Sequence, residues 1–227
     1  MKIEDKILLA LSSIFCTIIV TGNLIFQKFI VLNLYFHSFE ISVGVLLYPI
    51  TFLVMDLITE FYGKNTANYV IKVGIFVSLM LMLLIFVADL CSATIWSPVD
   101  NATFNRVFSV YGIGAMASLV ANFMAQTLDV AIFSKLKEIT NSKHLWLRNN
   151  VSTILGQLID TLCVVSILCF YNIIPFDKFN IIVINSFLFK TICALIDTPF
   201  CYFFHHILNN IIPKNTKAFA TENTVQA

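Results

Sequence analysis

Long apolar runs are the feature that most limits how this chain can fold. A helix that spans a bilayer needs about 20 predominantly apolar residues. Six runs meet this requirement, and we predict a transmembrane helix in each of them: 7–27, 41–62, 68–91, 111–135, 149–172 and 180–207. Of the 227 residues, 59% are hydrophobic and only 12% are charged, a balance that excludes a soluble domain of this size. The sequence therefore predicts an all-α, polytopic membrane protein.

The remaining segments are expected to lie outside the bilayer. Residues 92–110, SATIWSPVDNATFNRVFSV, are too polar to span and contain Ser97-Pro98, so we predict an exposed loop. Residues 213–227 are polar and are expected to form a flexible tail after a transmembrane domain of residues 1–212. The chain is thus expected to have one membrane domain and one short tail.

The positions of lysine and arginine predict the orientation, because these residues are enriched in cytoplasmic loops. With the N-terminus in the cytoplasm, ten of them lie inside and only three, Lys28, Arg106 and Lys178, lie outside. Lys190 falls within the last helix. Both termini are therefore predicted to be cytoplasmic.

Polar side chains recur within the predicted helices at intervals of three, four or seven residues, so that each set shares one helix face. Ionisable groups at bilayer depth usually face a wet cavity or the bundle interior. We therefore expect four polar stripes to surround one central cavity. The stripes are Tyr48, Phe52, Asp56 and Glu60; Ser118, Asn122, Gln126 and Asp129; Asn150, Thr153, Gln157 and Asp160; and Ser186, Lys190 and Asp197.

Two carboxylates occur in the same tetrapeptide, LIDT, at residues 158–161 and 195–198. Asp160 and Asp197 lie deep in their helices, as does Asp56, and we predict a functional role for all three. The alternative is that polar groups only join helices by hydrogen bonds, worth roughly 0.6–2 kcal/mol each in lipid; for Asn122 that alternative is favoured. Lys190 is a candidate partner that neutralises one of the carboxylates.

Charged groups near the predicted cytoplasmic ends have two interpretations. Glu60 and Asp129 lie within reach of Lys64, Lys135 or Arg148, so a salt bridge at the membrane boundary is at least as well supported as substrate contact. We therefore assign Glu60, Asp129, Arg148 and Lys190 to gating or ion coupling. Pro49 and Pro199 lie within helical patterns and predict kinks.

Several classes of function are excluded or disfavoured. No G-x-x-x-x-G-K-[ST] motif is present, so the chain does not hydrolyse ATP through a P-loop. The six cysteines form no CxxC pair, and we predict neither a metal site nor a cofactor. A net charge of +1 gives no support for nucleic-acid binding. An enzyme is the least favoured class.

Two long motifs carry a resemblance to a known family. The first is LLYPITFLVMDLITEFYGKNTA at 46–67, and the second is AQTLDVAIFSKLKEITNSKHLWLRNNVSTILGQLIDT at 125–161. The second contains two Q-x-x-D helices separated by a basic loop with Leu-Trp-Leu-Arg-Asn-Asn. Together with the six-helix pattern, they resemble the queuosine precursor transporters, also called the vitamin uptake transporter family.

This resemblance implies import of 7-deazaguanine precursors of queuosine, or of queuine, across the bacterial inner membrane. A carboxylate can accept hydrogen bonds from the ring N–H and the exocyclic amine of such a base, an amide can donate to its carbonyl, and aromatic rings can stack on it. We assign substrate binding to Tyr48, Phe52, Asp56, Asn122, Gln126, Gln157, Asp160 and Asp197. The alternative function is a substrate-binding membrane subunit that needs a separate ATP-driven module.

Two features of the assembly are also expected. If the chain consists of two three-helix halves of opposite topology, helix two corresponds to helix five, an arrangement that is common in transporters. A homodimer is possible. Beyond the lipid bilayer and a small deazapurine, no further partner is predicted.

The charge bias makes the topology testable. A reporter fused after Ala227 is expected to be cytoplasmic, and a reporter inserted near Asp100 is expected to be external, because ten of the basic residues then lie inside. Paired reporters that are active on opposite sides of the membrane measure this directly. The reverse pattern contradicts either the orientation or the number of helices.

Overall fold

The computed structural model describes residues 2–26, 28–34 and 37–211. Five long helices dominate it: α1 (Ile3–Ile25), α2 (Tyr48–Asp89), α3 (Asn101–Ile139), α4 (Leu145–Phe170) and α5 (Phe179–Ile211). Two short 3-10 helices, Val43–Leu47 and Phe176–Lys178, precede α2 and α5. Each long helix contains a stretch that is long and apolar enough to cross a membrane, so the chain is a polytopic membrane protein. The predicted tail, 213–227, lies outside the described residues.

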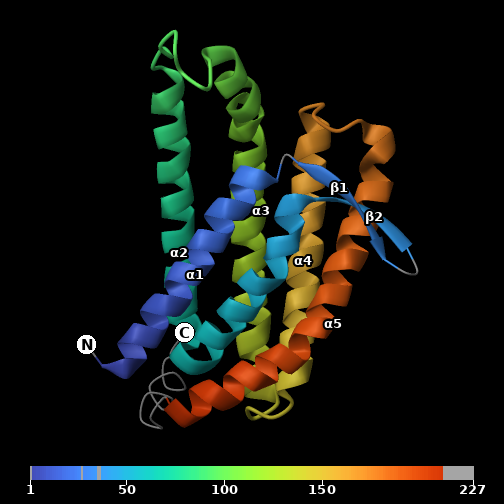
Figure 1. Cartoon of the computed structure of the whole chain (residues 1–227). Coiled ribbons are helices and arrows are strands. Elements are labelled where there is room, and N and C mark those ends of the chain that lie inside the picture. Colours follow the sequence, from blue (N-terminus) through green and yellow to red (C-terminus); the bar gives the residue numbers. More distant parts are fainter. Residues whose placement is uncertain (1, 27, 35–36, 212–227) are drawn as a thin grey trace.

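The predicted second and third helices are joined end to end within α2. This helix has 42 residues and would be about 63 Å long if straight, at 1.5 Å per residue, twice the thickness of a bilayer core. It turns instead at Gly63, where φ is 83° and ψ is 166°. Figure 1 shows the part before Gly63 descending through the centre of the bundle and the part after it rising along one edge. One helix therefore supplies two antiparallel segments.

A β-hairpin that the sequence patterns did not predict accompanies the expected helical bundle. Strand β1 (Phe29–Leu34) pairs antiparallel with β2 (His37–Ser42), with Phe29 opposite Ser42. Phe39 and Ile41 are buried, and the Phe39 ring meets Phe189 of α5 edge-on at 5.8 Å between centroids. The hairpin thus packs on α5 at the end of the bundle where α1 ends (Figure 1).

The predicted exposed loop at 92–110 is wrong in its second half, because α3 already begins at Asn101. The Asp100 side chain caps this helix by accepting a 2.8 Å hydrogen bond from the Thr103 backbone N–H. The same contact with Thr103 lowers the pKa of Asp100. A capping aspartate before a helix satisfies an otherwise unpaired donor, which explains why α3 extends beyond its apolar run.

The polar stripes face the interior of the bundle. Gln126, Asp129 and Gln157 are fully buried, and Asp56 and Asp160 are 1% exposed. Conversely, many large apolar side chains on the outside are exposed, including Phe76, Leu83 and Phe86 of α2. Such an inverted distribution is stable only when lipid covers the apolar surface, which agrees with the membrane class.

Gly63 makes the reversal of α2 testable. Its backbone conformation is essentially restricted to glycine, so Gly63→Ala is expected to lower the free energy of unfolding by about 1–3 kcal/mol. The matched control is Gly22→Ala in α1, whose new Cβ would meet only the Gly44 carbonyl oxygen at 3.8 Å. Thermal unfolding in detergent compares the two. Equal changes in the unfolding temperature contradict this account of the turn.

Candidate functional site

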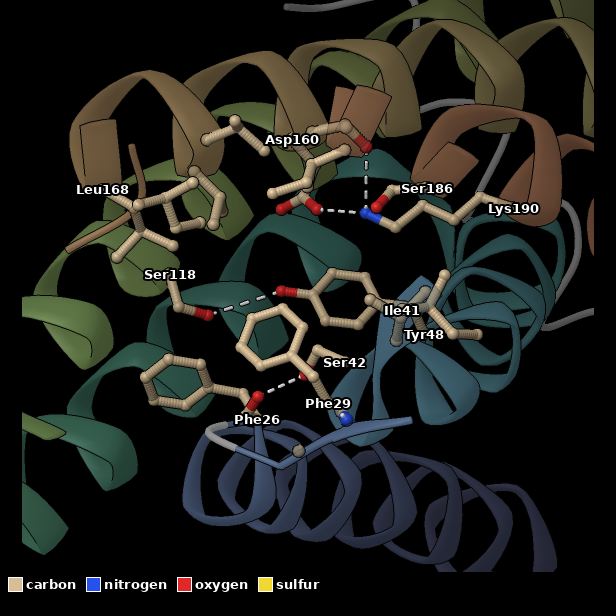
Figure 2. Close-up of a pocket in the computed structure, with 18 of the residues that line it drawn as sticks. Phe26, Phe29, Ile41, Ser42, Tyr48, Ser118, Asp160, Leu168, Ser186 and Lys190 are labelled. Atoms are coloured by element: carbon tan, nitrogen blue, oxygen red, sulfur yellow. Dashed lines mark hydrogen bonds and ion pairs between the residues drawn. The ribbon is translucent and has the colours of Figure 1, made fainter. Parts of the chain in front are cut away.

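A cavity lies where the hairpin meets all five long helices, with α3 contributing Ser118. Its volume is about 80 Å³, whereas a single water molecule needs roughly 10–15 Å³ of comparable space, so the cavity has room for a small ligand. Apolar side chains form most of its wall, with a few polar groups between them (Figure 2). The polar lining consists of Asn23, Glu40, Ser42, Tyr48, Ser118, Asp160, Thr161, Ser186 and Lys190.

A buried ion pair forms one wall of the cavity. The Lys190 ammonium donates to Asp160 Oδ2 at 2.6 Å and to Thr161 Oγ1 at 3.1 Å. It also lies 4.6 Å from the centre of the Tyr48 ring, within the range of a cation–π contact. Asp160 Oδ1 has no hydrogen-bond partner among the described residues, so one strong acceptor remains available to a ligand.

A second set of hydrogen bonds holds the opposite wall. The Ser118 hydroxyl of α3 donates to Asn23 Oδ1 of α1 at 2.6 Å, and the Tyr48 hydroxyl lies 3.4 Å from Ser118 Oγ. At the hairpin, the Ser42 hydroxyl donates to the Phe26 carbonyl. Tyr48 therefore has its ring at the ion pair and its hydroxyl at Ser118, as Figure 2 shows.

Two further carboxyl groups, Asp56 of α2 and Asp129 of α3, lie outside the cavity lining. We call them the carboxyl pair. Asp56 Oδ2 accepts from the Thr153 hydroxyl at 3.5 Å, and Asp129 has Asp56, Ser152 and Thr153 as polar neighbours. Gly156 lets α4 come close here, because an added Cβ would lie 3.0 Å from the Phe52 ring and 3.3 Å from Asp129 Cβ.

Two buried amides occupy the helix turns between the carboxyl pair and the cavity. Gln157 lies between Thr153 and Asp160 on α4, and Gln126 lies one turn before Asp129 on α3. The Gln126 amide donates weakly to Thr51 Oγ1 at 3.5 Å. Within the described part of the chain, its Oε1 and both polar atoms of Gln157 have no partner. Asn122, one turn earlier, is buried beside Tyr48, Thr51 and Asn23.

A cluster of charges lies one turn beyond Asp56, and we call it the inner cluster. Glu60 Oε1 accepts from Arg148 Nη2 at 2.7 Å, and Lys137 Nζ lies 3.0 Å from Glu60 Oε2. His205 Nε2 is 3.6 Å from Glu60 Oε1. Arg148 is only 1% exposed, and its guanidinium lies 5.3 Å from the centre of the Phe133 ring.

The structure thus separates the predicted site residues into three layers rather than one cavity. Tyr48, Asp160 and Lys190 line the cavity; Asp56, Asp129 and the two glutamines lie below it, with Phe52 packed against Gly156. Glu60 and Arg148 belong to the inner cluster. Asp197 is only partly buried and does not line the cavity, so the two LIDT copies have different surroundings.

Several of the lining residues were not among those that the sequence patterns identified. Asn23 is a lone amide in an apolar helix, which could have identified it, since buried amides in membrane helices need partners. Glu40 and Ser42 belong to the unpredicted hairpin. There, Phe39 and Ile41 alternate with polar residues, a period of two that is typical of a half-buried strand.

A helical membrane bundle with buried charges and a partly enclosed cavity that has a few polar groups in its wall is typical of membrane transporters. The chain belongs to a family of this class, because residues 42–204 match the family model described as "Putative vitamin uptake transporter". No solved structure matches the chain.

Two curated relatives carry the same name, "Probable queuosine precursor transporter". The relative from Bacillus subtilis (strain 168) is 30% identical over 162 residues, which cover 71% of this chain and 70% of the relative. The relative from Haemophilus influenzae (strain ATCC 51907 / DSM 11121 / KW20 / Rd) is 31% identical over 139 residues, which cover 61% and 56%. The chain is therefore a multi-pass membrane protein of a transporter family that has bacterial members. The possible homodimer stays a prediction.

The Lys190–Asp160 pair generates a stability prediction. Lys190→Met leaves a carboxylate buried without its cation, which is expected to cost about 3–5 kcal/mol of unfolding free energy. Adding Asp160→Asn removes that charge, so the double variant is expected to recover most of the loss. Thermal unfolding of the parent, both single variants and the double variant completes a double-mutant cycle, which measures the interaction energy between the two residues. Single variants with parental stability contradict a buried pair.

Proposed function

We propose that the chain imports 7-deazaguanine precursors of queuosine, or queuine, across the bacterial cytoplasmic membrane. The family and the names of the two relatives support the substrate class. The observation that carries the proposal is the Asp160–Lys190 pair in the cavity wall, with its free Asp160 Oδ1. A guanine-like edge presents a carbonyl acceptor next to two donors, and this pair offers the complementary ammonium donor and carboxylate acceptors.

The remaining lining fits the flat shape of such a base. Tyr48 and Phe29 present aromatic rings at the cavity (Figure 2), and rings of this kind stack on heterocycles. Gln126 and Gln157 are the next hydrogen-bonding groups toward the carboxyl pair. Their unpaired atoms would receive the base after it leaves the cavity, so we keep both as binding residues for a later step, together with Asn122.

The arrangement of helices supports six membrane crossings with both termini in the cytoplasm. The reversal of α2 at Gly63 provides the additional crossing. The start of α1 and the end of α5 lie at the same end of the bundle (Figure 1), as an even number of crossings requires. The first three crossings and the last three then run in opposite directions, which is the pattern of an inverted repeat.

The inner cluster supports a gate at the cytoplasmic end. Arg148 comes from α4, Glu60 from α2 and Lys137 from α3. Their ion pairs therefore hold these three helices together at this end of the bundle. Opening toward the cytoplasm would require the Arg148–Glu60 contact to break and both groups to become hydrated.

Binding and uptake measurements test the proposal. Deazaguanine derivatives are expected to raise the unfolding temperature of the purified protein, and the chain alone is expected to take them up in liposomes. The Asp160→Asn/Lys190→Met double variant lacks the charged acceptor and donor, and should lose roughly 2–4 kcal/mol of binding free energy, about 30- to 1,000-fold in affinity. Isothermal titration measures this loss.

The matched control uses the second LIDT copy. Asp197→Asn makes the same change as Asp160→Asn alone but outside the cavity lining, so its loss of affinity should be much smaller than that of the Asp160→Asn single variant. Equal losses in the two variants contradict the assignment of the site to Asp160. Binding without uptake by the chain alone would favour a subunit that depends on a separate ATP-driven module.

A further inference from the structure

We propose that the carboxyl pair, Asp56 and Asp129, is a proton-binding site in which the two groups share a single proton. The site is distinct from the substrate cavity, because neither residue lines it. Its use in transport, as the point where proton movement is coupled to substrate movement, rests on the proposed function. The binding of the proton rests only on the described residues.

Burial of the pair is the first observation. Asp56 is 1% exposed and Asp129 is fully buried. Three of their four carboxyl oxygens, Asp56 Oδ1 and both oxygens of Asp129, have no hydrogen-bond partner in the described part of the chain. Two neighbouring carboxylates in a low-dielectric interior repel each other and do not both ionise. A proton between them replaces this repulsion with a strong charge-assisted hydrogen bond.

The charge balance along the bundle axis is the second observation. Lys190 and Asp160 cancel each other. In the inner cluster, Lys137 and Arg148 exceed Glu60 by one positive charge when His205 is neutral. A fully ionised carboxyl pair carries two negative charges, which leaves the axis one negative charge in excess. One shared proton makes these named groups neutral, with the partly exposed Asp197 left out of the sum, and a membrane interior strongly favours neutrality.

The groups around the pair do not supply this positive charge directly. The hydrogen bonds and ion pairs of the described residues place no lysine, arginine or histidine on Asp56 or Asp129; only Thr153 donates to Asp56. The titratable and charged groups that face this region come from every neighbouring helix. They are Glu60 on α2, Cys16 on α1, Lys137 on α3, Arg148 on α4, and Cys201 and His205 on α5.

The position of the pair links proton binding to the gate. Asp56 lies one helical turn from Glu60 and two turns from Tyr48. When the inner cluster opens and becomes hydrated, the positive charge that balances the pair is screened, so the affinity for the proton changes with the state of the gate. By reciprocity, release of the proton biases the gate.

Replacing one aspartate of the pair by asparagine imitates the protonated pair. The variant then has one neutral amide and one carboxylate, and the protonated parent has one neutral acid and one carboxylate, so both carry a single negative charge. Asp129→Asn is therefore expected to fold as well as the parent at neutral pH. In the parent, the folded pair holds a proton that the unfolded chain releases, so stability falls as pH rises. Asp129→Asn should lose this dependence and unfold at nearly the same temperature across mildly acidic to alkaline pH.

A ligand-free experiment tests the site itself. Infrared spectra of the reconstituted parent should contain the C=O band of a buried carboxylic acid. This band should disappear in Asp129→Asn and in Asp56→Asn, and persist in Asp197→Asn. The band can also disappear in only one of the two variants. This result still supports the site if the variant that keeps the band has an unfolding temperature that no longer depends on pH. A band that persists in both, with parental pH dependence, overturns the proposal.

A transport experiment tests the coupling in liposomes. An inward proton gradient of about one pH unit should drive the parent to accumulate the deazaguanine about tenfold, at one proton per substrate and 1.4 kcal/mol per tenfold ratio. Asp129→Asn should exchange substrate across the membrane without accumulating it. Accumulation by Asp129→Asn equal to that of the parent overturns the coupling, as does accumulation driven by a sodium gradient in place of the proton gradient.

The two proposals fail in different ways. If the proposed function is wrong, no deazaguanine stabilises the protein, while the infrared band and its loss in Asp129→Asn remain. If the proton site is wrong, the parent still binds the deazaguanine at the cavity, but the band survives both substitutions.

Discussion

A charge that leaves water for the interior of a membrane protein must be balanced by an opposite charge in the bundle or be removed by protonation, because the bilayer itself supplies no compensation. This constraint organises the bundle. Lys190 of α5 meets Asp160 of α4 at 2.6 Å, and Glu60 of α2 meets both Arg148 of α4 and Lys137 of α3. Helices in lipid gain little from the hydrophobic effect when they associate, so these ion pairs tie together four helices that apolar packing alone would join weakly.

The sequence predicts the fold correctly where the length of an apolar run determines whether a helix forms. Five helices coincide with predicted runs, and their polar stripes are buried because no other surface of a lipid-facing helix accepts such groups. The departures arise where length is not decisive. The hairpin depends on a short alternation around Phe39 and Ile41, and α3 extends into a polar segment because Asp100 caps it. The reversal at Gly63 depends on one backbone angle, which an apolar pattern does not contain.

The candidate site was predictable in composition but not in pairing. Spacing of three and four residues identifies which side chains share a face, and those of Asp56, Gln126, Gln157 and Asp160 are indeed buried. Which of these groups meet depends on the rotation and height of each helix, which one sequence does not define. Lys190 was a candidate partner for any of several carboxylates, and only the structure brings it to Asp160. The same limit explains why identical LIDT segments differ: α4 buries its aspartate, whereas α5 leaves Asp197 partly exposed.

Helix α5 physically connects the cavity with the inner cluster. This helix contacts the cavity through Lys190 and borders the inner cluster through His205, whose ring lies 5.2 Å from that of Phe61 and whose Nε2 is 3.6 Å from Glu60. Pro199 lies inside the helix between these two points, where it removes a backbone hydrogen bond, and α5 changes direction along its length (Figure 1). A ligand that draws Asp160 away from Lys190 changes the forces on one end of a helix whose other end touches Glu60. The cavity and the inner cluster are therefore joined by a single bent element, with the carboxyl pair between them.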